Sequence, residues 1–218
     1  DRRQRQMCIR DRVYEGGINE ESQDKETGYE QVAPTVYALV AAIDAKDSFT
    51  FQHSTNVSQY AVLLAQKLGL SRNDIQTVKV AGLLHDIGKI GIPESILKKA
   101  GKLTNEEYEI MKSHVEKSIE MIHYLPNMNY VIPAVVSHHE RYDGKGYPRG
   151  IKGEEIPFLG RILAVCDSFD AMISKRAYKE PLSVEYAMGE LEKNKGTQFD
   201  PEVADAFIEL IKEGKVPL

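Results

Sequence analysis

The chain has 218 residues, 42% of them hydrophobic, which suffices for one domain with a sizeable buried core. Its formal net charge of -5 argues against a nucleic acid polymer as partner, and no apolar run approaches the roughly 18 residues of a membrane span. With only Cys8 and Cys166, the chain has no disulfide framework and no zinc-finger spacing, so a reducing cytoplasm is the expected setting.

Residues 1–29 are expected to lie outside the folded domain. The run Met7–Asp11 (MCIRD) resembles the translation of a sequencing-library adapter, so residues 1 to about 12 are interpreted as an assembly scar. A native basic arm is the alternative. Residues 13–29 are polar and aperiodic, as expected for a linker. If the scar interpretation holds, an upstream sensory or receiver domain could be missing.

Helical periodicity dominates the remaining chain, and no β alternation of useful length is present. The apolar stretch Ala33–Ala45 predicts a buried first helix. Residues 54–68 repeat apolar side chains at i, i+3, i+4 and i+7, which predicts an amphipathic helix that ends at Gly69. The expected fold class is all-α.

Helix-capping signals mark the next two predicted helices. Ser71 and Asp74 have the spacing of a capping box, and the helix that follows leads into His85. Thr104 and Glu107 have the same spacing. The helix after them is expected to place His114 beside one apolar face, which comprises Tyr108, Met111, Val115 and Ile122.

The C-terminal half reads as four further helices and a long loop. Residues 131–140 predict a short helix that ends in a histidine pair, and Tyr142–Gly150 forms a Gly- and Pro-rich loop. Apolar residues 161–173 predict a helix interrupted by Asp167 and Asp170. Two more helices are expected at residues 183–195 and after Asp200-Pro201, where proline favours a helix start.

Five of the six histidines and two aspartates form a candidate metal-ligand set. Charged aspartates beside apolar helical residues are costly unless they are paired or bind metal. Nitrogen and oxygen ligands without thiolates suit manganese, iron, cobalt or zinc and argue against structural zinc. The sixth histidine, His123, lacks such neighbours and is left out. The set is His53, His85, Asp86, His114, His138, His139 and Asp167.

Two motifs resemble a known family. HDIGK (His85–Lys89) is similar to the HD superfamily of metal-dependent phosphohydrolases, and HHERYDGKGYP (His138–Pro148) resembles the signature of its HD-GYP branch. Flanking blocks such as LTNEEYEIMKSH and SKRAYKEPLS extend the resemblance over roughly residues 31–210. It implies an HD-type helical bundle with a GYP loop, and we assign residues 30–218 to this domain.

The resemblance also implies roles for individual residues. All seven candidates above would ligate metal, with Asp86 bridging two ions, for which iron or manganese is expected. Some family members carry a glutamate for a third ion where this chain has Phe49, so a two-metal site is expected. Asp86 and Lys89 would be catalytic, and the substrate-binding residues would be Lys89, Tyr147, Arg176 and Lys179.

The implied activity is that of a cyclic-di-GMP phosphodiesterase in bacterial second-messenger signalling, which forms pGpG and could continue to GMP. Hydrolysis of cyclic GMP-AMP is an alternative within the branch. A second alternative is a catalytically silent module that binds nucleotide or a diguanylate cyclase domain. Guanosine-tetraphosphate hydrolysis is disfavoured, because acidic residues follow HD in that branch, where this chain has Ile87, Gly88 and Lys89.

Overall fold

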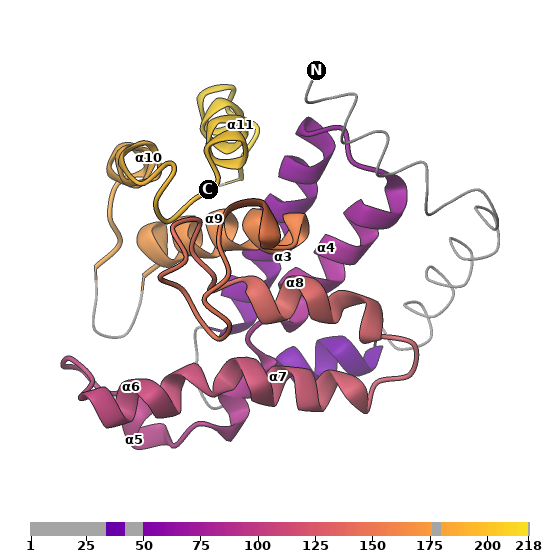
Figure 1. Ribbon diagram of the computed structural model, residues 1–218, viewed down its shortest axis with the longest axis vertical. Coiled ribbons are helices and arrows are strands. Elements are labelled where there is room, and N and C mark those ends of the chain that lie inside the picture. Colours follow the sequence, from indigo (N-terminus) through magenta and orange to yellow (C-terminus); the bar gives the residue numbers. More distant parts are fainter. Residues whose placement is uncertain (1–33, 42–49, 176–179, 218) are drawn as a thin grey trace.

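The computed structural model describes residues 34–41, 50–175 and 180–217 (Figure 1). Within these ranges all regular elements are helices, apart from an isolated bridge between Lys195 and Phe199, so the predicted all-α class is confirmed. None of the described helices is both long enough and apolar enough to cross a membrane. The expectations for residues 1–29 and for Phe49 lie outside the described residues.

The first described helices form the pair on which the site is built. Residues 34–41 are helical and bury Val36 and Val40. Helix α3 (Thr50–Lys67) begins earlier than the predicted residue 54, so His53 lies inside it. Gly69 then adopts a positive φ of 69°, as expected at a helix end.

Helix α4 (Arg72–Leu84) packs along α3 and ends directly before His85. Ser71 caps its start by accepting a hydrogen bond from the Asp74 N–H. The reciprocal bond of a full capping box is replaced, because the Ser71 hydroxyl donates to the Asp74 carboxylate. Two short elements that the sequence did not predict follow α4, namely η1 (Ile87–Gly91) and α5 (Glu94–Leu97).

The single helix expected after Thr104 is two helices, α6 (Asn105–Lys112) and α7 (His114–His123), which run almost in line in Figure 1. The capping box at Thr104 is confirmed. The break occurs at Ser113, whose hydroxyl donates to the Ile110 carbonyl and so competes with helical bonding. The predicted apolar face is buried only in its α7 half, because α6 buries none of its residues.

The four helices predicted for the C-terminal half are present in the predicted order, and two short 3-10 helices that the sequence did not predict lie among them. The histidine pair follows α8 directly, and Ser183 and Asp200 cap the last two helices. The elements are η2 (Asn129–Val131), α8 (Ile132–Ser137), η3 (Gly153–Glu155), α9 (Phe158–Ile173), α10 (Val184–Lys193) and α11 (Pro201–Lys212).

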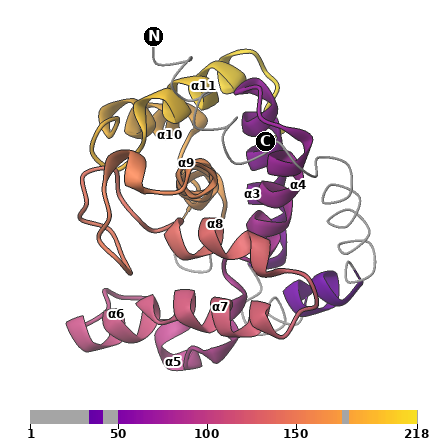
Figure 2. The same cartoon turned by 45° about the vertical axis from the view of Figure 1, so that its right-hand side comes forward.

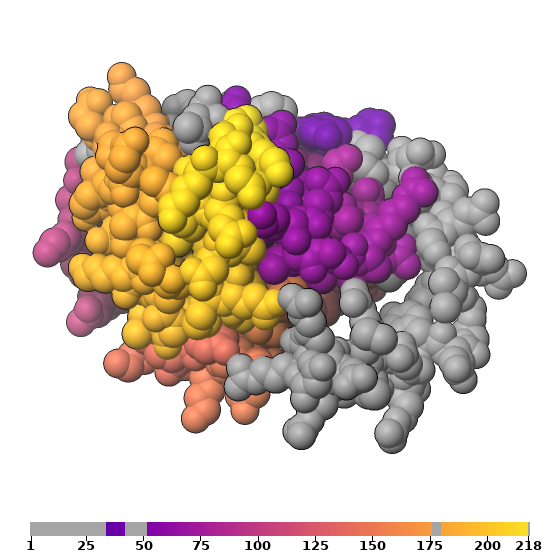
Figure 3. Space-filling model, turned by 90° about the horizontal axis from the view of Figure 1, so that it is seen from above, coloured from indigo at the N-terminus to yellow at the C-terminus, as the bar shows by residue number. Residues whose placement is uncertain are grey.

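Helix α9 is the centre of the fold and contacts α3, α4, α8, α10 and α11. Figure 2 shows it enclosed by these helices, and Figure 3 shows α11 lying between α10 and the α3–α4 pair. Three buried aromatic rings join α3, α9 and α11, with Phe169 5.7 Å from Tyr60 and 5.1 Å from Phe207 between ring centroids. Such packing holds the inner faces of α3 and α9 in fixed positions.

A glycine sets the distance between η1 and α7. A Cβ atom on Gly88 would lie 2.0 Å from the His114 carbonyl oxygen, so no other residue fits without displacement. The Gly88 N–H donates to Ser118 Oγ at 2.8 Å, and this hydroxyl donates to the His85 carbonyl at 3.0 Å. The start of α7 is therefore held directly against the His85-Asp86 turn.

Candidate metal centre

The seven predicted ligand side chains come together in one cluster inside the bundle. Five of them are at most 4% exposed, and the other two, His139 and Asp167, are partly buried. Polar groups buried this deeply require partners. Their positions are His53 in α3, His85 and Asp86 after α4, His114 at the start of α7, His138 and His139 after α8, and Asp167 in α9.

Three of the histidines are held by the helix ends on which they lie. Nδ1 of His85 lies 2.7 Å from the Gly82 carbonyl oxygen, and His114 and His138 make the equivalent contact three residues back. Because an N–H group at Nδ1 donates to that carbonyl, Nε2 is left as the lone-pair nitrogen that faces the cluster. Carbonyl support of this kind is typical of metal-ligating histidines.

Several buried atoms of the cluster lack hydrogen-bond partners within the described residues. They are Nε2 of His53, His85, His114 and His138, together with Oδ1 of Asp86. Buried unpaired acceptors are rare because each costs free energy when desolvated. Imidazole nitrogens and carboxylate oxygens that lack hydrogen-bond partners are suitable ligands for divalent metal ions. The cluster is therefore suited to metal binding.

The Asp86 carboxylate belongs to two ligand groups at once. Oδ1 lies 3.3 Å from His114 Nε2, whereas Oδ2 lies 3.3 Å from His85 Nε2 and 3.7 Å from His53 Nε2. One group comprises Asp86, His114, His138 and His139, and the other comprises His53, His85 and Asp86. Within each group the ligand atoms lie within 4.8 Å of one another. This arrangement is the one that a carboxylate bridging two ions would have.

Asp167 extends the second group. Its Oδ1 lies 3.2 Å from His53 Nε2 and 3.9 Å from His85 Nε2. The pKa of Asp167 is lowered, because hydrogen bonding and charge from His53 outweigh the burial that would raise it. Asp167 is therefore ionised and available as an anionic ligand beside His53 and His85.

The charge states of the other ligands also suit cation binding. Burial lowers the pKa of His138 well below its usual value and that of His139 to about 4, so both imidazoles are neutral at pH 7. For His53, burial lowers the pKa but hydrogen bonds with Asp167 and Asp170 raise it to about 9. A proton thus occupies His53 in the metal-free chain, and a bound cation would displace it.

Asp170 is a site residue that the sequence analysis did not assign. It is fully buried one turn after Asp167, and its Oδ2 lies 2.7 Å from His53 Nδ1. Asn56 Nδ2 and Ser174 Oγ donate to the same carboxylate at 2.8 and 3.0 Å. Carboxylates that hold a ligating histidine in this way fix its ring orientation. The i, i+3 spacing of Asp167 and Asp170 was the available signal.

Lys89 reaches the cluster as expected. It lies in η1, and its Nζ is 2.5 Å from Asp86 Oδ2. Burial raises the pKa of Asp86, but Lys89 and the neighbouring histidines hold it well below its usual value. An ammonium group is thus available beside the bridging carboxylate, with part of its surface open to solvent.

The loop at residues 141–150 lies against the cluster. The Tyr147 ring stacks on His139, with ring centroids 4.8 Å apart. Gly144 has a positive φ of 80°, which confirms its role in the turn. Gly146 approaches the loop's own base, because a Cβ there would lie 2.3 Å from Arg141 N. The same Cβ would lie 2.5 Å from Glu140 Cα and 2.6 Å from the His139 carbonyl oxygen, so this glycine also lets the loop pack against the backbone of the histidine pair.

Arg176 and Lys179 lie outside the described residues. Arg161 Nη1 lies 2.5 Å from Asp200 Oδ2 at the start of α11, which makes it a structural ion pair. His123 is exposed and contacts Asn129. Cys166 is a free cysteine buried in the core.

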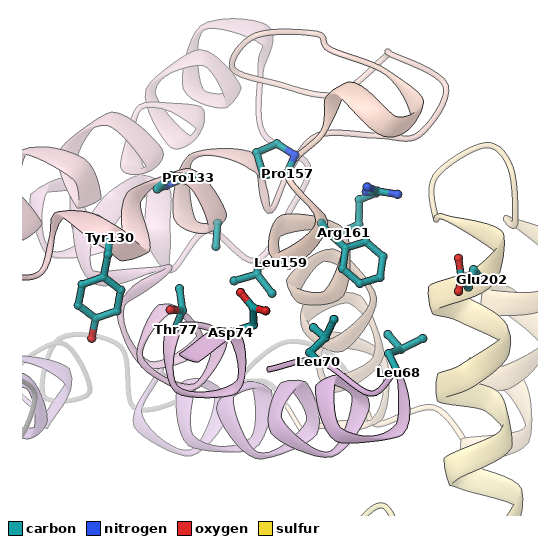
Figure 4. A pocket seen from close by; sticks show the side chains of 12 residues that line it. Leu68, Leu70, Asp74, Thr77, Tyr130, Pro133, Pro157, Leu159, Arg161 and Glu202 are labelled. Atoms are coloured by element: carbon teal, nitrogen blue, oxygen red, sulfur yellow. The ribbon is translucent and has the colours of Figure 1, made fainter. Parts of the chain in front are cut away.

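A hollow of about 480 Å³ opens elsewhere on the molecule (Figure 4). Its apolar lining includes Leu68, Leu70 and Leu159, and Arg161 and Glu202 stand at one side. No predicted metal or substrate residue lines it, so it is separate from the histidine cluster.

Comparison with known families agrees with this geometry. A family model described as HD domain matches residues 38–203. The chain belongs to the HD domain family. A solved HD structure of a HDG"Y"P protein from Bdellovibrio bacteriovorus superposes with a TM-score of 0.62 at 20% identity, covering 75% of this chain and 54% of that one. This is a likeness of fold.

Two curated relatives carry the HD region at higher identity. A cyclic di-GMP phosphodiesterase from Thermotoga maritima is 44% identical over 77% of this chain and 46% of its own length. A 3'3'-cGAMP-specific phosphodiesterase 2 from Vibrio cholerae is 39% identical over 80% of this chain and 34% of its own length. The resemblance to the HD-GYP branch is thereby confirmed. The chain spans less than half the length of these relatives.

Proposed function

We propose that this HD domain is a metal-dependent phosphodiesterase that hydrolyses cyclic-di-GMP. The observation that carries the proposal is the sharing of Asp86 between two ligand groups, one on each side of its carboxylate. A pair of divalent ions would supply Lewis acidity toward a phosphodiester and make water a nucleophile near neutral pH. The name of the Thermotoga maritima relative points to the same substrate.

The proposed ligand assignment follows the two groups. One ion would be held by His53, His85, Asp86 and Asp167, and the other by Asp86, His114, His138 and His139. We propose two ions, one for each ligand group, and iron or manganese as their identity, on the hardness of the nitrogen and oxygen ligands and on the family resemblance. Metal analysis of purified protein that found three tightly bound ions per chain would contradict the two-ion assignment.

Lys89 is proposed to act on the substrate phosphate. Its ammonium group lies beside Asp86 and keeps some exposure, so it can hold a non-bridging phosphate oxygen or protonate the leaving oxygen. Arg176 and Lys179 are proposed to bind substrate phosphate, on the family resemblance alone. A diguanylate cyclase partner, an upstream receiver domain and a cytoplasmic setting also remain proposals.

A second candidate substrate is 3'3'-cGAMP, which the name of the Vibrio cholerae relative favours. The test is side-by-side turnover of both cyclic dinucleotides by the metal-loaded chain, with products separated by chromatography. The proposal predicts faster conversion of cyclic-di-GMP to pGpG, and any further GMP will be seen in the same traces. Faster turnover of 3'3'-cGAMP would reverse the assignment. A fully metal-loaded chain that binds but converts neither would be a silent receptor.

A further inference from the structure

Two side chains of α6, Tyr108 and Lys112, lie beside the Tyr147 ring, which stacks on His139 at the metal centre. The Tyr108 ring meets the Tyr147 ring edge-on, with centroids 6.3 Å apart. Lys112 Nζ lies 5.3 Å from the Tyr108 centroid and 5.7 Å from the Tyr147 centroid. Figures 1 and 2 both show the loop that follows α8 reaching toward α6. The loop and α6 therefore present two rings and one ammonium group together.

Tyr147 and Tyr108 differ in how much of each side chain is exposed and able to contact a ligand. Tyr147 is partly buried and has His139 stacked on its ring, so little of it remains for another partner. Tyr108 is 47% exposed, on a helix that buries none of its residues. Core packing therefore does not account for an aromatic side chain at residue 108. Nearly half of Tyr108 is open to a ligand, beside the Lys112 ammonium group that lies over its ring.

The charge of Lys112 is available to a ligand. Its present partner is Glu109 Oε1 at 2.6 Å, and the Glu109 side chain is 69% exposed. Ion pairs of this kind contribute little to stability and exchange readily with solvent. Lys112 can therefore turn from Glu109 to an acceptor on a bound molecule without loss of fold.

We propose that Tyr108 and Lys112 form a guanine-binding subsite at the edge of the metal centre. The inference rests on the proposed function, which supplies a substrate with two guanine bases. Any nucleobase can stack on an aromatic ring, so Tyr108 provides affinity whichever base is bound. Guanine presents the acceptors O6 and N7, whereas adenine presents N7 and an N6 donor, so the Lys112 ammonium favours guanine. Tyr147 then serves as the support between Tyr108 and His139.

Calorimetric titration of the metal-loaded chain with GMP, AMP and inorganic phosphate tests this subsite. Tyr108→Ala is expected to weaken GMP binding roughly tenfold, the effect of losing one base–aromatic stack, while inorganic phosphate affinity is retained. Tyr108→Phe is expected to restore GMP binding, because the ring is kept. Lys112→Met is expected to reduce the preference for GMP over AMP.

The matched control is Tyr124→Ala, since Tyr124 is 88% exposed at the opposite end of α7 and lies away from the cluster. It should bind GMP like the wild-type chain. Unchanged GMP affinity in Tyr108→Ala, or an equal loss of GMP and phosphate, would overturn the subsite. So would a wild-type chain that does not bind GMP. The titration needs no turnover, so a chain inactive on cyclic-di-GMP would refute the proposed function and leave the subsite testable.

Discussion

His53 Nδ1 and Asp170 Oδ2 lie 2.7 Å apart in the interior, and this contact links helices α3 and α9 at the metal centre. Asp170 is 0% exposed and also accepts hydrogen bonds from Asn56 and Ser174. Its carboxylate is thus fixed from three directions, and the His53 ring is fixed through it. The orientation of one ligand therefore depends on a residue that is not itself a ligand.

Replacing Asp170 with asparagine should weaken metal binding while leaving the helices folded. The amide keeps the size of the side chain but loses the charge that holds the His53 ring, and losses of about 10- to 100-fold are typical for such supporting residues. Competition with a chelator measures the affinity. Asp205→Asn is the control, because Asp205 is an exposed residue of α11 that pairs with Lys195. Equal metal affinity in Asp170→Asn and the wild-type chain would refute the supporting role.

Local signals in the sequence predicted most of the helices, because a capping residue lies next to the helix that it starts. Thr104 and Asp200 are such cases, and both caps are present. The contact of His53 with Asp170 joins residues 117 positions apart, and the i, i+3 spacing of Asp167 and Asp170 does not indicate which side chain Asp170 contacts. The break at Ser113 was missed since its hydroxyl competes for a carbonyl inside an otherwise continuous helical pattern.

The ligand set was predicted through motifs, and the structure brings those seven residues together. The motifs did not predict that the Tyr147 ring stacks on His139. Tyr147, which was expected to bind substrate, has its ring stacked on His139, and the exposed ring is that of Tyr108. This packing brings Tyr108 of α6 against a loop more than 30 residues later in the sequence.

Replacing Gly88 with alanine should destabilise the domain and its metal centre together. The added Cβ would lie 2.0 Å from the His114 carbonyl oxygen and 2.4 Å from the Ser118 nitrogen, both backbone atoms that cannot move aside cheaply. We expect the free energy of unfolding in urea to fall by about 2 kcal/mol or more.

Gly189→Ala is the matched control for that substitution. Gly189 lies in α10, and a Cβ there would meet nothing within 4 Å. Alanine should raise the free energy of unfolding by roughly 0.5–1 kcal/mol, because it favours the helix. If the two substitutions changed stability alike, the close packing of η1 against α7 would not be the cause.

Replacing Lys89 with methionine should lower kcat for cyclic-di-GMP by roughly 100-fold or more, since the residue is proposed to act on the phosphate or the leaving oxygen. Lys89→Arg separates these roles: it keeps the charge and should restore activity if Lys89 holds the phosphate, but not if it donates a proton. Lys193→Met, at an exposed lysine of α10, is the control. Full activity in Lys89→Met would exclude both roles.

The most direct test of the account is product analysis of the metal-loaded chain with cyclic-di-GMP, alongside the variant Asp86→Ala. Because Asp86 is shared by both ligand groups, the account predicts pGpG from the wild-type chain and none from the variant, which should also lose bound metal. Intact cyclic-di-GMP after incubation with a fully loaded wild-type chain, or equal pGpG formation by Asp86→Ala, would contradict it.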